Sequence, residues 1–108
     1  MQMKQISAPD LAAWLADASR EKPLLLDVRE PWEFERARIE GAQLVPMREV
    51  PSRVGEIDPH KEVVAICHHG GRSMQVAVFL EKAGYKVHNL TGGVDAWSRT
   101  VDPAVPIY

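Results

Sequence analysis

The segment Val63 to Leu80 carries the single cysteine of this 108-residue chain. An apolar run ends there, and a short polar loop follows: Cys67, His68, His69, Gly70, Gly71, Arg72 and Ser73. Glycine adopts backbone conformations closed to other residues, so the loop can curl and point its N–H groups at one centre, where they bind an anion. Arg72 and the amino end of a helix expected from Ser73 add positive potential. The loop is therefore predicted to favour the thiolate of Cys67, a nucleophile, and to hold an anion beside it.

A lone cysteine is more often a small buried hydrophobic residue, and this is the alternative for Cys67. That role needs none of the glycines, histidines and arginine that follow, so we favour the nucleophile. His68 and His69 are expected to be loop donors or exposed side chains whose charge depends on pH. A metal site is disfavoured, because consecutive residues do not readily converge on one ion and no further close-spaced ligand follows. We predict neither a metal nor a cofactor.

Strand and helix patterns alternate along the chain. Short apolar runs predict strands at 3–6, 24–28, 43–45, 62–66 and 86–90. Helices are expected from a Ser7 cap to about residue 18, at 31–36, in short pieces within 47–57, and at 73–83 and 94–99. Residues 101–108 contain two prolines and are expected to lie extended over the surface.

This order of elements predicts an α/β fold in one domain over residues 1–108. The expected architecture is a three-layer α/β/α sandwich with a mainly parallel five-stranded sheet. Open parallel sheets place their active sites beyond the carboxyl ends of the strands. Cys67 lies at that end of the most apolar strand.

Composition and charge exclude several classes of function. The formal charge is -2, with 13 Lys and Arg against 15 Asp and Glu, which does not favour a nucleic-acid partner. No apolar stretch approaches the roughly 20 residues that span a bilayer, and the first residues lack the pattern of a secretory signal. One cysteine cannot form an internal disulfide. We therefore expect a cytoplasmic protein with a reduced thiol and no membrane partner.

Three segments, in this order and spacing, resemble the rhodanese family of sulfurtransferases. They are LLLDVREPWEFERARIEGA (24–42), CHHGGRS (67–73) and NLTGGVDAW (89–97). The first departs from the family pattern at Ala37 to Ala42, where a His and a Pro are missing. Since that segment lies outside the cysteine loop, the fold is expected to survive.

The resemblance implies that Cys67 takes a sulfane sulfur from an anionic donor such as thiosulfate, forming a persulfide. Cyanide, a thiol or a partner protein would then accept the sulfur. The resemblance also implies that residues 68–73 bind the donor and that Asp27, Arg29 and Glu33 support the loop through ion pairs. Trp32, Phe34 and Trp97 are expected to be packing residues.

Three alternatives stay open at this stage. The chain could be a persulfide carrier supplied by a protein donor, or a non-catalytic interaction module that keeps the fold. A phosphatase or arsenate reductase is the third. Related phosphatases place one residue more between the cysteine and the arginine than the four found here, so we disfavour that reading.

Overall fold

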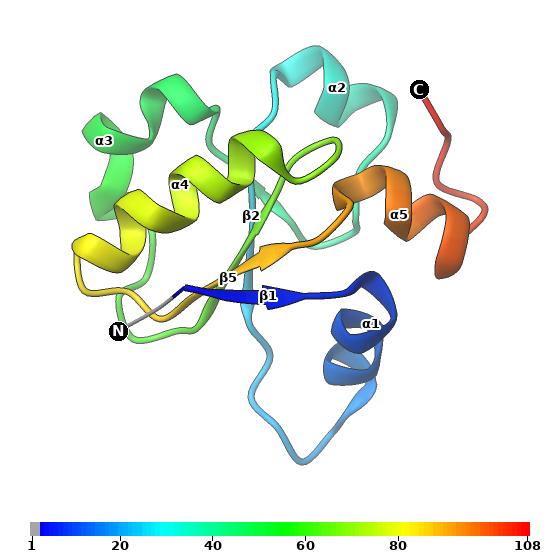
Figure 1. Cartoon of the computed structure of the whole chain (residues 1–108), viewed down its shortest axis with the longest axis horizontal. Coiled ribbons are helices and arrows are strands. Elements are labelled where there is room, and N and C mark those ends of the chain that lie inside the picture. The colour runs from blue at the N-terminus through cyan, green and yellow to red at the C-terminus, as the bar shows by residue number, and fades with distance from the viewer. Residues whose placement is uncertain (1–2) are drawn as a thin grey trace.

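Five parallel strands form a sheet across the middle of the molecule (Figure 1). The computed structural model describes residues 3–108. The strands are β1 (Lys4–Ile6), β2 (Leu24–Asp27), β3 (Gln43–Leu44), β4 (Val63–Ile66) and β5 (Val87–Leu90). Their order is β1-β5-β4-β2-β3, and every neighbouring pair is parallel. The expected five-stranded parallel sheet is confirmed.

Helices cover both faces of the sheet and complete the three-layer sandwich. α1 (Ala8–Ala16) and α5 (Gly93–Thr100) lie on one face, and α3 (Val50–Arg53) and α4 (Gly71–Lys82) lie on the other (Figure 1). Side chains alternate across β4 because successive Cβ atoms point to opposite faces. Val63 and Ala65 therefore pack with α4, whereas Val64 and Ile66 pack with α1 and α5. α2 (Pro31–Arg36) and two 3-10 turns (Met47–Glu49 and Val54–Glu56) complete the chain.

The ends of the helices follow local chemistry. Ser7 caps α1 as expected, since its Oγ accepts the N–H of Asp10 over 3.2 Å. α4 begins at Gly71, two residues before the predicted start. Gly70 takes a φ of +108°, and the helical hydrogen bonding starts there, with Met74 N donating to Gly70 O over 3.2 Å. The loop between Cys67 and α4 is thus shorter than predicted.

One expectation about packing is wrong. Trp32 is not a packing residue: it is 61% exposed, because the short α2 buries only the side that carries Glu33. The segment 101–108 lies over the surface as expected, with no helix or strand and no fully buried residue. Val105 and Tyr108 pack against the core cluster of α1 and α5, and the chain returns to the neighbourhood of α2 (Figure 1). Trp97 is buried, as expected, and Phe34 is half-buried.

Candidate active site

Cys67 directly follows β4, the central strand of the sheet. The residue is only 1% exposed. Its sulfur has two polar neighbours: the N–H of Gly70 donates to Sγ over 3.1 Å, and the Oγ of Ser73 lies 3.2 Å from it. The first turn of α4 begins in the same loop, so free N–H groups of that helix end give the region a positive potential. A negatively charged sulfur or ligand would find hydrogen-bond donors here.

The backbone of the loop is packed against the start of α5. Val94 N donates to Cys67 O over 2.9 Å, and Asp95 N donates to His68 O over 3.1 Å. A Cβ built on Gly93 would lie 2.2 Å from Cys67 O and 2.5 Å from His68 O. Position 93 therefore requires glycine, because only a residue without a side chain lets α5 come this close to the cysteine loop.

Ser73 joins the sulfur to a buried amide on β5. Its hydroxyl donates to Asn89 Oδ1 over 2.5 Å, and Asn89 Nδ2 donates to Gly70 O over 3.2 Å and to Gln5 Oε1 over 3.1 Å. Asn89 is 3% exposed. Sequence reasoning missed this residue, although a lone Asn in a buried strand was a signal: a buried amide needs partners, and here the partners are the cysteine loop.

Arg72 reaches across the site to α2. Its Nη1 and Nη2 donate to the two carboxylate oxygens of Glu33 over 2.7 and 2.8 Å. This bidentate pair lowers the pKa of Glu33 to about 2, and the same pair raises the pKa of Arg72 above its ordinary range. Arg72 was expected to be a cation open to the donor. The structure instead pairs its charge with a carboxylate.

Asp27 and Arg29 form a buried ion pair below this contact, and neither side chain is exposed. Arg29 Nη2 donates to Asp27 Oδ2 over 2.7 Å and to Ala37 O over 2.6 Å. Arg29 Nη1 donates to the Tyr108 hydroxyl over 2.7 Å, and that hydroxyl donates to Glu33 Oε2 over 2.8 Å. One connected chain of contacts therefore runs from Asp27 through Glu33 to Arg72.

The two loop histidines lie in a row of stacked rings. The centroid of His68 lies 3.9 Å from that of Tyr108 on one side and 3.9 Å from that of His69 on the other. Burial, followed by the proximity of His69, lowers the pKa of His68, so its ring is mainly neutral at pH 7. Its Nε2 is buried without a hydrogen-bond partner.

His68, His69 and Asp95 place one donor atom each within 4.8 Å of one another, so the fold supplies a third ligand that the sequence spacing did not show. The imidazole planes are only 25° apart, however, and stacked. A ligand nitrogen binds a metal in the plane of its ring, and two nearly parallel planes do not meet within a coordination bond. The arrangement is thus a ring stack and not a preformed metal centre.

Known proteins with similar sequences identify the family of this chain. The profile of the rhodanese-like domain matches residues 11–100. The chain belongs to the rhodanese-like family. It is 38% identical over 104 residues to a protein named "Sulfurtransferase" from Allochromatium vinosum, covering 95% of each chain. It is 34% identical over 74 residues, 68% of this chain and 70% of the relative, to a thiosulfate sulfurtransferase of Tolumonas auensis.

This rhodanese-like chain also resembles part of a longer protein and the whole of a solved structure. It is 38% identical over 112 residues to the chloroplastic rhodanese-like/PpiC domain-containing protein 12 of Arabidopsis thaliana, covering 98% of this chain but 38% of that protein. The crystal structure of a rhodanese-like domain protein from Staphylococcus aureus superposes with a TM-score of 0.84 at 28% identity, covering 98% of this chain and 99% of that one. The rhodanese-like fold expected from the three sequence segments is confirmed.

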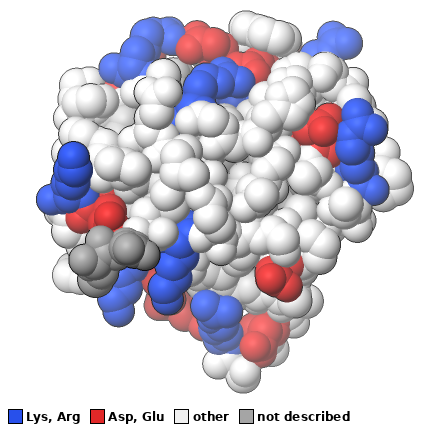
Figure 2. All heavy atoms as spheres, viewed as in Figure 1, with Lys and Arg blue, Asp and Glu red and all other residues white. Residues whose placement is uncertain are grey.

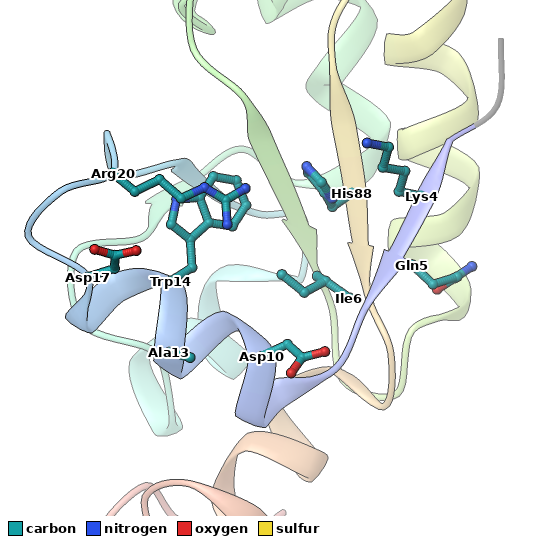
Figure 3. A pocket seen from close by; sticks show the side chains of 9 residues that line it. All are labelled: Lys4, Gln5, Ile6, Asp10, Ala13, Trp14, Asp17, Arg20 and His88. Carbon is teal, nitrogen blue, oxygen red and sulfur yellow. The ribbon is translucent and has the colours of Figure 1, made fainter.

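A separate hollow lies elsewhere on the described part of the chain. This hollow of about 420 Å³ lies between α1 and β1, where Arg20 covers the ring of Trp14 and His88 faces it from β5 (Figure 3). Its lining residues are separate from those of the Cys67 loop. Positive and negative side chains lie beside one another around the rim of the face drawn in Figure 2. Within residues 3–108, no helix combines the length and apolar character needed to cross a bilayer.

Proposed function

We propose that this rhodanese-like chain is a sulfurtransferase that carries a sulfane sulfur on Cys67, with thiosulfate as a donor. The thiolate of Cys67 attacks the outer sulfur of thiosulfate, and a bond forms between Sγ and that sulfur. The sulfur–sulfur bond of thiosulfate breaks, and sulfite leaves with the electron pair. Cyanide or a thiolate then attacks the outer sulfur of the persulfide and restores the Cys67 thiolate. The cycle needs no second cysteine.

The observation that carries this proposal is the position of the Cys67 sulfur. It accepts the N–H of Gly70 and lies beside Ser73, at the positive end of α4. The Gly70 N–H and the helix end stabilise negative charge on Sγ and, after transfer, on the outer sulfur of a persulfide. The relatives named sulfurtransferases support the same chemistry. Because the cycle needs a free thiol, we propose that the chain works in a reducing compartment such as the cytoplasm.

Each of the other loop residues has a proposed part. His68, His69, Gly70, Gly71 and Arg72 line or shape the donor site, and Ser73 fixes the sulfur. Asp27, Arg29 and Glu33 support the loop through the buried contacts that end at Arg72. A protein that delivers or receives the sulfur would meet the chain at this same edge of the sheet.

Intact-protein mass spectrometry tests the proposal directly. The purified chain is incubated with thiosulfate, freed of excess donor, and weighed beside Cys67→Ala. The expected result is a gain of one sulfur atom in the wild type only, removed by cyanide with release of thiocyanate. A gain that survives in Cys67→Ala would refute the role of the cysteine. No gain in a wild type whose thiol still reacts with iodoacetamide would exclude thiosulfate and favour a sulfur delivered by a protein.

A further inference from the structure

Tyr108 lies at the centre of the contacts that hold Arg72. Its hydroxyl accepts from Arg29 Nη1 over 2.7 Å and donates to Glu33 Oε2 over 2.8 Å. Its ring stacks on His68 with planes 10° apart, and Trp32 meets its edge at 5.9 Å between centroids. The return of the chain from α5 to α2 delivers this side chain (Figure 1).

The hydroxyl of Tyr108 has a fixed hydrogen-bond direction. Arg29 can only donate, and an ionised Glu33 can only accept, so the hydroxyl must accept from the first and donate to the second. Burial raises the pKa of Tyr108 to about 12, so its proton is present throughout the neutral range. The hydroxyl therefore separates the guanidinium of Arg29 from the carboxylate of Glu33 and satisfies both.

The carboxylate of Glu33 pairs with the guanidinium of Arg72, and the Tyr108 hydroxyl lies between it and the guanidinium of Arg29. The side chain binds Arg72 through both oxygens, whereas Arg29 touches only the main-chain carbonyl of Glu33, over 3.4 Å. Without the hydroxyl, Arg29 Nη1 would be a buried donor with no strong acceptor, which is costly. The carboxylate of Glu33 binds the same hydroxyl as Arg29 and is an acceptor that would replace it, and moving toward Arg29 would weaken its bidentate contact with Arg72.

We propose that Tyr108 is a specificity-determining residue of the Cys67 site: it holds Glu33 against Arg72 and so withholds the Arg72 charge from anionic reagents that approach the sulfur. For natural substrates, this role of Tyr108 rests on the proposed sulfurtransferase function. In the intact site the loop N–H groups recognise the donor, and the Arg72–Glu33 pair contributes little net charge. Loss of the hydroxyl shifts the preference of the site toward anions.

The test compares two alkylating reagents that differ in charge. Iodoacetate and iodoacetamide both react with a thiolate by displacing iodide, so the ratio of their rate constants at Cys67 reports the electrostatic potential at the sulfur and cancels changes in its nucleophilicity. The variants are Tyr108→Phe, which keeps the ring, and Tyr108→Leu, which also removes the stack on His68. Tyr85→Phe is the matched control, because that buried hydroxyl donates to Ile57 O over 2.8 Å, away from the site.

We expect Tyr108→Phe to raise the iodoacetate-to-iodoacetamide ratio by about three- to tenfold, as a freed unit charge near the sulfur would. Tyr85→Phe should leave the ratio unchanged. Arg72→Ala should abolish the effect, so that Tyr108→Phe no longer alters the ratio in that background. An unchanged ratio in Tyr108→Phe, or the same increase in the presence and absence of Arg72, would overturn the proposal. An effect seen only with Tyr108→Leu would also overturn it and assign the role to the ring.

The outcome does not depend on sulfur transfer, because alkylation needs only the thiol. If the wild type takes up sulfur from thiosulfate, Tyr108→Phe should lower the KM for thiosulfate by a similar factor and leave the KM for a neutral acceptor thiol unchanged. An altered alkylation ratio in a chain that takes up no sulfur from thiosulfate would refute thiosulfate as the donor while supporting the assignment of Tyr108.

Discussion

Gly93 lies against the carbonyl oxygen of Cys67, so close that a Cβ on the glycine would lie 2.2 Å from that oxygen. The contact joins the start of α5 to the loop that carries the sulfur. It is reinforced by the hydrogen bond from Val94 N to Cys67 O. The position of Cys67 thus depends on a residue from the next strand–helix unit of the sheet.

Substitution of this glycine should disrupt the site. Gly93→Ala would clash with two main-chain oxygens and force a side chain onto a φ of +59°, so we expect a loss of about 3 kcal/mol or more in the free energy of unfolding. Gly55→Ala is the control, because its Cβ would meet nothing within 4 Å. Urea denaturation of both variants gives the comparison. Equal stabilities would show that α5 can move away without cost.

Ser73 should affect the reactivity of Cys67 beyond its effect on stability. Ser73→Ala leaves Asn89 Oδ1 buried without its donor, so about 1–2 kcal/mol of stability should be lost. Ser98→Ala removes a comparable buried bond, to Val94 O, away from the sulfur. Only Ser73→Ala should change the rate of alkylation of Cys67 by iodoacetamide, because it alone removes an atom in contact with Sγ. Equal alkylation rates would remove Ser73 from the site.

Glu33 should make stability depend on pH at the acid end. The carboxyl has a pKa of about 2 in the folded chain against an ordinary value of 4.5. Its contribution to the free energy of unfolding is therefore complete above pH 4.5 and is lost as the pH falls toward 2. We expect Glu33→Gln to be less stable than the wild type by roughly 2–3 kcal/mol at pH 7. The two urea midpoints should converge between pH 4.5 and 2.

The control for this prediction lies on the same helix. Glu35 is exposed, and Glu35→Gln should leave the stability at pH 7 unchanged. A Glu33→Gln variant whose stability stays parallel to that of the wild type down to pH 2 would contradict the proposed charge of Glu33 in the folded state.

The buried ion pair below the site should be far more sensitive than the exposed ones. Asp27→Ala leaves the guanidinium of Arg29 unpaired in the interior, so about 3–5 kcal/mol should be lost. Arg48→Ala breaks a pair with Glu30 in which both side chains are exposed, and its effect should be much smaller. Thermal unfolding distinguishes the two. Similar Tm values for Asp27→Ala and Arg48→Ala would mean that water reaches Asp27.

Much of this protein is determined locally by its sequence. Apolar runs such as Val63–Ile66, separated by helical patterns, specify a parallel sheet because each run must be buried on both faces. The chemistry of the cysteine loop is also local, since Cys67, Gly70 and Ser73 lie within a few residues and their contacts follow from one tight turn. The fold could therefore be predicted from the order of residues alone, and the same local pattern singles out Cys67 as the proposed nucleophile.

Only the tertiary structure decided which distant side chains complete the site. Glu33 pairs with Arg72 from 39 residues away, and Tyr108 reaches Glu33 from 75 residues away. Such partners are chosen by where helices and the returning chain pack on the sheet, and no local pattern encodes that placement. For the same reason Arg72 looked like a free cation in the sequence, and folding supplied the carboxylate that pairs with its charge.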